Sequence, residues 1–136
     1  MRTIEEILQS TSDVLFPADL GQRRVAIDSR GADGDTPLHV MLWRKDFGAA
    51  KDLIEAGADP NAVGDMGETP LHVAIRQDAA DIVDSLLAAG ANPDIRSEFG
   101  DTPRAMAAVK KGAIARLLKQ AAPNNSFKPK PLRGSA

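Results

Sequence analysis

Gly34-Asp35-Thr36-Pro37-Leu38-His39-Val40 is the stretch that decides the fold, because it returns twice at a fixed spacing. The second copy is Gly67-Glu68-Thr69-Pro70-Leu71-His72-Val73, and the third, degraded copy is Gly100-Asp101-Thr102-Pro103-Arg104-Ala105-Met106. Each copy lies 33 residues after the one before it. A second motif, Ala56-Gly57-Ala58-Asp59-Pro60-Asn61, returns as Ala89-Gly90-Ala91-Asn92-Pro93-Asp94 at the same offset. Two motifs in one register indicate a repeat, and repeats of this length stack into solenoids.

The residues around the two motifs predict a pair of short helices followed by an extended loop. Thr36 and Thr69 are expected to be helix N-caps, each followed by a proline at the first helical position, where the missing N–H has no helical partner. We expect a first helix of about ten residues, a break near 46–48 and a second helix that ends at Gly57, with the same pattern one period later. One such unit cannot bury its own apolar face, so neighbouring units have to stack. The expected core residues are Leu53, Ile54, Leu71, Val73, Ile82, Val83, Leu86 and Leu87.

The 33-residue period, the Thr-Pro-Leu-His opening and the Gly-Ala-Asp ending resemble the ankyrin repeat family. The resemblance is close over 34–99 and weaker over 100–122, where Arg104 replaces the leucine of the motif. It implies an all-α ankyrin-repeat solenoid with β-hairpin-like loops and a concave groove that binds other proteins. It also implies that each motif histidine bonds to its threonine and to the neighbouring loop. The residues that it makes structural are Thr36, His39, Thr69 and His72.

The chain is expected to form one repeat domain with imperfect ends. Thr3 lies one period before the first motif threonine and opens a capping-box pattern, but Pro17 interrupts the second helix, so this unit is a degenerate cap. The last unit is expected to deviate as terminal repeats do, with its second helix shifted by a residue or two. Residues 123–136 are basic, Pro- and Asn-rich and without periodicity, which predicts a disordered tail. The domain spans 1–122 and has four units: 1–33, 34–66, 67–99 and 100–122.

Composition argues against an enzyme and against a membrane protein. The 136-residue chain has no Cys and only two His, which excludes thiolate metal sites, iron–sulfur clusters and cysteine nucleophiles. No apolar run approaches the roughly 20 residues that span a bilayer, and the acidic start of the chain is unlike a signal peptide. We therefore expect a cytoplasmic protein with no catalytic residues, no metal and no cofactor.

Two groups of residues resemble ligand sites but lack the required pattern. His39 and His72 occupy equivalent positions in adjacent repeats, yet no third His or Cys completes a metal site. Segments 33–35 and 65–68 have neither the ligand spacing of an EF-hand nor the Gly-Lys-Ser/Thr of a phosphate loop. Such segments are typical of turns in which glycine supplies a positive φ.

Large side chains on the expected groove are the candidate binding residues. The resemblance places this groove at the loop tips and on the outer face of each first helix. Trp43, Met66 and Phe99 fall there, where structure alone favours small or polar groups, and such side chains are enriched in protein interfaces. An alternative for Trp43 is that it folds over the irregular N-terminal unit. The full predicted contact set is Asp33, Trp43, Arg44, Asp65, Met66, Glu68, Arg76, Gln77, Glu98 and Phe99.

The net charge of −2 conceals an acidic body and a basic end. Residues 1–99 hold 9 Lys/Arg and 18 Asp/Glu, whereas residues 100–136 hold 8 Lys/Arg and one acid. The basic residues lack the aromatic interleaving of a nucleic-acid site, so we expect neither a nucleic-acid nor a membrane partner. The acids at the loop tips are expected to attract a basic protein, unless they serve solubility alone. They are Asp33, Asp35, Asp65, Glu68, Glu98 and Asp101.

Taken as a whole, the sequence predicts a monomeric, non-enzymatic module that binds a partner protein with a basic surface. A narrower alternative is a bacterial immunity or antitoxin protein that neutralises a basic toxin. A third is a scaffold that associates with itself through its atypical ends. The fold by itself does not name a partner, because function resides in the site.

Overall fold

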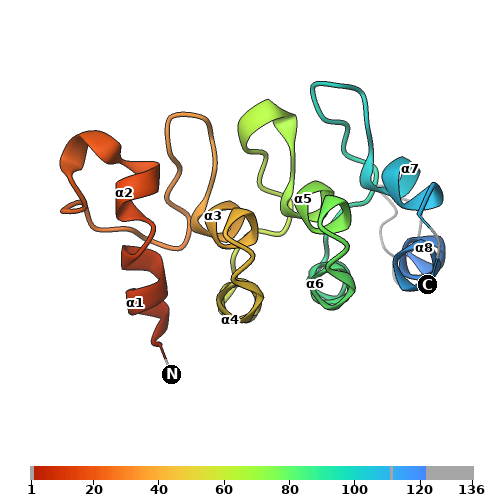
Figure 1. The fold of residues 1–136 in the computed structure, drawn as a ribbon, viewed down its shortest axis with the longest axis horizontal. Coiled ribbons are helices and arrows are strands. Elements are labelled where there is room, and N and C mark those ends of the chain that lie inside the picture. Colours follow the sequence, from red (N-terminus) through yellow and green to blue (C-terminus); the bar gives the residue numbers. More distant parts are fainter. Residues whose placement is uncertain (1, 111, 122–136) are drawn as a thin grey trace, which may run out of the picture.

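The computed structural model describes residues 2–110 and 112–121, and every regular element in these ranges is helical. Three helix pairs follow one another along the molecule after shorter N-terminal segments, as the predicted all-α solenoid requires (Figure 1). None of the helices in these ranges is long and apolar enough to span a membrane. The helices are α1 (Ile4–Gln9), α2 (Ser12–Leu15), α3 (Pro37–Trp43), α4 (Phe47–Glu55), α5 (Pro70–Arg76), α6 (Ala80–Ala88), α7 (Pro103–Ala108) and α8 (Ala113–Gln120), and the 3₁₀ turns are η1 (Pro17–Asp19) and η2 (Asp65–Gly67).

The first helix of each pair begins at a threonine, as the motif predicts. The hydroxyls of Thr36, Thr69 and Thr102 each accept a hydrogen bond from the backbone N–H three residues on, and a proline follows each threonine. Thr3 caps α1 in the same way, and the Glu6 carboxylate accepts the N–H of Thr3 to complete the predicted capping box. These bonds satisfy N–H groups that have no partner within the helix.

The first helices are shorter than expected, because a residue with left-handed backbone dihedral angles follows soon after each of them. Helices α3 and α5 have 7 residues each, and Lys45 and Asp78 follow them with φ of 60° and 57°. The second helices α4 and α6 end as predicted, where Gly57 and Gly90 have φ of 104° and 100°. Glycine is favoured at these two positions because it has no Cβ to clash in this conformation.

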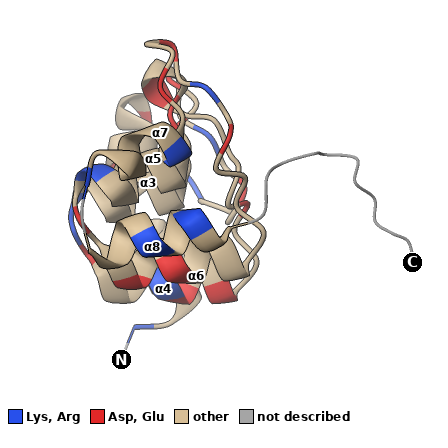
Figure 2. Cartoon of the chain, turned by 90° about the vertical axis from the view of Figure 1, so that its right-hand side faces the viewer, with Lys and Arg blue, Asp and Glu red and all other residues tan. Residues whose placement is uncertain are grey.

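Hairpin-like loops rise from one side of the stack and share one pattern of closure (Figure 1). In the first loop, the N–H of Gly31 donates to the carbonyl of Asp35 at 2.9 Å. The same bond joins Gly64 to Glu68 in the second loop and Ser97 to Asp101 in the third. Viewed from the C-terminal end, the loops project beyond a layer of first helices, and the second helices form a layer behind it (Figure 2). The loops therefore stand next to the first helices, which is the geometry expected of a groove.

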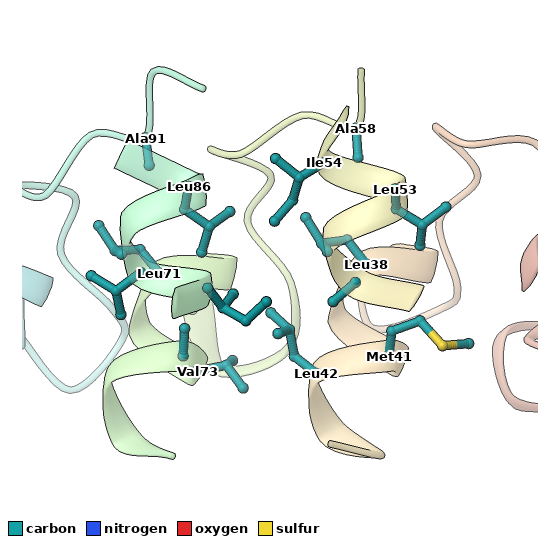
Figure 3. Close-up of a cluster of buried hydrophobic side chains, with 14 of the residues drawn as sticks. Leu38, Met41, Leu42, Leu53, Ile54, Ala58, Leu71, Val73, Leu86 and Ala91 are labelled. Carbon is teal, nitrogen blue, oxygen red and sulfur yellow. The ribbon is translucent and has the colours of Figure 1, made fainter. Parts of the chain in front are cut away.

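The core lies between the two helix layers and between neighbouring pairs (Figure 3). All the residues predicted for it are buried except Leu87, which packs at its edge. Ala50 and Ala74 are completely buried, and their short side chains allow helices to approach closely. The buried cluster runs continuously from Ile7 in α1 to Leu118 in α8. Each unit thus buries its apolar face against its neighbours, as stacked repeats must.

The two end units depart from the repeat in the ways expected. Pro17 begins the 3₁₀ turn η1 in place of a second helix, so the N-terminal unit is irregular. In the last unit, the buried residue Ile114 lies 32 rather than 33 residues after its counterpart Ile82, a shift of one residue. The tail predicted at 123–136 lies outside the described residues.

Candidate protein-binding surface

One position at the end of each first helix forms a row beside the loops. It is occupied by Trp43, Arg76 and Val109, which follow one another at 33-residue intervals. Arg76 shows that a side chain at this position can point toward the loops, because its guanidinium bonds to the Glu68 side chain in the second loop. Trp43 is 41% exposed and Val109 82%. The row therefore offers two accessible apolar side chains, with a partly exposed guanidinium between them.

The expectation that Glu68 presents its charge at a loop tip is wrong. Its side chain is only 2% exposed, and its Oε1 accepts a hydrogen bond from Nη1 of Arg76 at 2.8 Å while Oε2 accepts one from Nη2. A carboxylate removed from water needs such a partner, and the guanidinium fork supplies two parallel bonds. The bond with Glu68 raises the pKa of Arg76 above its usual value. Glu68 therefore positions Arg76 and is not available to a binding partner.

The N-terminal unit is attached to the stack by Arg44. Its Nη2 donates to the carbonyl of Ser10 at 3.1 Å and lies 3.8 Å from Oδ1 of Asp13. A second ion pair, from Arg2 to Asp46 at 2.7 Å, joins the start of the chain to the N-cap of α4. The contacts of the irregular unit thus include both arginines, and Trp43, next to Arg44 in the chain, is partly exposed.

The residues equivalent to Arg44 also reach back to the unit before them. Gln77 donates its side-chain N–H to the carbonyl of Leu42 at 2.8 Å, and Lys110 forms an ion pair with Asp78 at 2.7 Å. The three side chains at this repeat position therefore connect successive units. We leave Arg44 and Gln77 out of the binding surface proposed below, because the Arg44 guanidinium and the side-chain N–H group of Gln77 already bond to the preceding unit, and Oε1 of Gln77 is buried without a hydrogen-bond partner among the described residues.

The tips of the second and third loops carry two accessible apolar side chains. Phe99 is 67% exposed and Met66 37%. The N–H of Glu98 donates to the carbonyl of Met66 at 3.0 Å, so the two tips are held side by side. Met66 has a φ of 60°, in the left-handed region that is unusual for a residue with a side chain. The loops thus place Met66 and Phe99 near one another at their outer ends.

Exposed carboxylates accompany these apolar groups along the loops, which Figure 2 shows in red near the tips. Asp35 is an exception, because it is half-buried and its Oδ1 accepts the N–H of Asp65 at 2.9 Å, which joins the first loop to the second. With Glu68 buried as well, the acidic tips contain fewer accessible charges than the sequence suggests. The remaining exposed acids are Asp33, Asp65, Glu98 and Asp101.

The motif histidines connect each unit to the loop of the next. Nδ1 of His39 accepts the N–H of Thr36 at 3.1 Å, so Nε2 carries the proton and donates to the carbonyl of Glu68 at 3.0 Å. His72 makes the same pair of contacts with Thr69 and with the carbonyl of Asp101. Burial lowers the pKa of His39 from its ordinary value of 6.5, which favours this neutral form. Among the described residues, no group of three or more acids and histidines could hold a metal ion.

This ladder of threonine and histidine contacts occupies the part of the chain that known repeat families match. A family model of a single ankyrin repeat matches residues 33–65, and a model of ankyrin repeats in many copies matches residues 53–107. Together the two matches cover more than half of the chain. The chain belongs to the ankyrin repeat family. Ankyrin repeats are generally protein–protein interaction modules, and no curated protein matches this chain.

The last ankyrin unit contains a structural arginine that the sequence analysis missed. Arg104 replaces the motif leucine, pairs with Asp94 at 2.9 Å and donates to the carbonyls of Leu118 and Ala121 at 2.9 and 3.2 Å. Carbonyls in the last turn of a helix have no helical partner, and a cation there is favourable. The replacement of an apolar motif residue by arginine, ten residues after an aspartate, is the signal that could have indicated it. Arg104 thus caps the end of α8.

Proposed function

We propose that the chain binds a partner protein across the loop tips and the row of first-helix residues. The observation that supports this most strongly is the presence of three large accessible side chains, Trp43, Met66 and Phe99, on the side where the loops meet the first helices. Val109 extends the row into the last unit. Side chains of this kind dominate the centres of protein interfaces, and their exposure in the free protein has a cost unless a partner covers them.

The exposed areas of Phe99 and Trp43 set an upper limit on what each can contribute to binding, because ordering and desolvation costs offset part of it. A fully buried aromatic side chain covers about 150–250 Å². The 67% of Phe99 that is exposed corresponds to about 130 Å², which is worth about 3 kcal/mol if a partner buries it completely. The 41% of Trp43 corresponds to about 100 Å² and about 2.5 kcal/mol. Both upper limits exceed the roughly 2 kcal/mol that defines a hot spot, so each residue can act as one.

The charge of the surface favours a basic partner. The Arg76 guanidinium is already paired with Glu68. Among the described residues of the loops, the exposed carboxylates of Asp33, Asp65, Glu98 and Asp101 outnumber the exposed guanidiniums of Arg30 and Arg96, so the charge along the loops is negative. Complementary charge accelerates association more than it adds affinity, and salt screens it. We therefore expect the association rate constant to fall as ionic strength rises, with a smaller change in the dissociation rate constant.

A pull-down from the native host, followed by mass spectrometry, identifies candidate partners, and the dissociation constants of variants then test the surface. We expect Trp43→Ala and Phe99→Ala each to weaken binding at least about tenfold, since about 1.4 kcal/mol corresponds to that factor. Leu20→Ala is the matched control, because it removes an apolar side chain that is 83% exposed in the N-terminal unit. Unchanged affinity in both aromatic variants, with folding intact, would contradict the proposal.

A narrower form of the proposal is that the partner is a basic toxin that this protein neutralises. The exposed carboxylates along the loops support it, since a cationic, nuclease-like toxin would match them. Co-expression with the product of a neighbouring gene tests it: rescue of growth supports an immunity role, and continued toxicity contradicts it. A self-associating scaffold is the other alternative, and a molar mass that stays constant with concentration in light scattering would exclude it.

A further inference from the structure

A pocket lies where the N-terminal unit meets the first loop. Figure 1 shows α2 beside this loop, at the N-terminal end of the row of loops. The two segments approach closely, since a Cβ added to Gly31 would lie 3.0 Å from the carbonyl oxygen of Leu15. The pocket is therefore framed by packed backbone. Its lining includes Val14, Leu15, Pro17, Ala32, Asp33 and Asp35.

The volume of this pocket suits one long side chain. It measures about 170 Å³, whereas pockets for drug-sized ligands measure about 300–1,000 Å³. The space is small for a nucleotide or a drug-sized ligand, and a single long side chain such as lysine or arginine is the better match.

The lining is divided into an apolar wall and an acidic one. Val14 is 54% exposed and, with Pro17, offers apolar surface from the N-terminal unit. Asp33 supplies an exposed carboxylate from the first loop, whereas the carboxylate of Asp35, which also lines the pocket, turns toward the second loop and accepts the N–H of Asp65. A long basic side chain has the matching division, because its methylene stem packs on apolar groups while its charged end seeks an anion. A neutral apolar side chain would leave the Asp33 carboxylate without a partner.

The charge of Asp33 is not neutralised by the described part of the chain. Asp33 has no hydrogen bond or ion pair with any described residue. Asp35 uses Oδ1 to accept the N–H of Asp65, a contact that leaves its negative charge in place. Arg30, the cation nearest to the loop in sequence, donates to the carbonyls of Gly34 and Val63 at 3.1 and 2.9 Å. The pocket therefore presents unpaired negative charge against an apolar wall.

We propose that this pocket receives a lysine or arginine side chain of the partner protein, at the N-terminal end of the binding surface. This inference deepens the proposed function and rests on it for its biological role. It adds a specific subsite to a general preference for basic partners, because charge alone would attract a basic surface anywhere along the loops. Specificity then comes from a pocket in which both the apolar stem and the charged end are matched.

The test needs no partner, because single amino-acid derivatives serve as probes. N-acetyl-lysine methylamide and N-acetyl-arginine methylamide are titrated into the isotope-labelled full chain while amide resonances are followed by NMR. We expect saturable shifts concentrated at residues 31–35, with a dissociation constant on the order of 1–10 mM, as suits a single side chain. N-acetyl-norleucine methylamide, which has the stem of lysine without its charge, is expected to bind at least about fivefold more weakly.

Variants separate this pocket from general electrostatic attraction. Asp33→Asn is expected to raise the dissociation constant of both charged probes at least about fivefold, and it should fold normally because Asp33 has no partner among the described residues. Glu55→Gln, a change to an exposed carboxylate on α4, is the control and should leave the shifts at 31–35 unaltered. Absence of saturable shifts, equal binding of norleucine, or shifts spread over all the loop tips would each overturn the inference. Neither Trp43 nor Phe99 is among the residues given for the pocket lining, so we expect Trp43→Ala and Phe99→Ala to leave this titration intact, and failure of the wider groove proposal is then distinguishable from failure of the pocket.

Discussion

Arg76→Ala leaves the buried carboxylate of Glu68 without its partner, and we predict a loss of about 3 kcal/mol in the free energy of unfolding. Breaking a buried ion pair from one side costs about 3–5 kcal/mol, because an uncompensated charge stays out of water. Breaking an exposed pair costs about 0–1 kcal/mol. Glu68 is 2% exposed but Arg76 is 44% exposed, which places the expected loss at the lower end of the buried range.

Urea unfolding of the single and double variants measures this contribution. Glu68→Gln removes the charge and keeps a polar side chain of similar shape, so its expected cost is smaller, about 1–2 kcal/mol. The double variant Arg76→Ala/Glu68→Gln should be more stable than Arg76→Ala by about 1–2 kcal/mol, since it has no unpaired buried charge. Lys110→Ala is the control: its partner Asp78 is 72% exposed and regains water, so the loss should stay below about 1 kcal/mol.

Two results would refute this reasoning. A loss below about 1 kcal/mol for Arg76→Ala would mean that the pair behaves as a surface ion pair. A double variant no more stable than Arg76→Ala would mean that the unpaired charge of Glu68 is not the cause of the loss. In either case the description of Glu68 as the residue that positions Arg76 would have to be abandoned.

Three further predictions concern the loops, the C-terminal end and pH. Gly64→Ala places a Cβ 2.9 Å from Nε2 of His39 and should lower the free energy of unfolding by at least about 2 kcal/mol. Gly48→Ala, in α4 with open space around it, should instead raise it by roughly 0.5–1 kcal/mol, and thermal unfolding of both variants checks this. Arg104→Leu restores the motif residue but removes the bonds to the end of α8, so the α8 amides should exchange hydrogen faster than those of α4, and equal rates would contradict the capping role. Burial lowers the pKa of His39, so on acidification the unfolded chain takes up this proton near pH 6.5, before the folded chain does. The free energy of unfolding should therefore be constant above pH 6.5 and fall below it by up to about 1.4 kcal/mol per pH unit. An NMR titration in which the His39 ring titrates at or above pH 6.5 would exclude this.

The repeat motifs contain most of the information about the backbone. Thr36 and Thr69 with their prolines predict where helices begin, and Gly57 and Gly90 predict where they end, because each residue type has a local conformational reason to stand there. The apolar spacing predicts the core with the exception of Leu87. These inferences need only interactions within a few residues, which a repeated pattern displays directly.

The sequence did not predict the side-chain contacts between units. Gln77 contacts Leu42 from 35 residues away, and Arg44 contacts Ser10 from 34 residues away. Their partners depend on how one unit sits on the next, and the 33-residue pattern does not specify the direction of each side chain. Glu68 was misjudged for a related reason: its side chain pairs with Arg76, eight residues later in the chain, and the motif alone does not show this pairing. A charged residue in a repeat therefore has to be placed together with its possible partners in neighbouring helices.

The most direct test of the central claim is the footprint of the bound partner, measured by amide hydrogen exchange on the full chain with and without it. Docking across the groove predicts slower exchange at the loop tips, residues 65–68 and 97–101, and at the ends of α3 and α5, with α4 and α6 unchanged. Protection confined to α4 and α6, on the layer behind the first helices, with the tips unaffected would contradict the account.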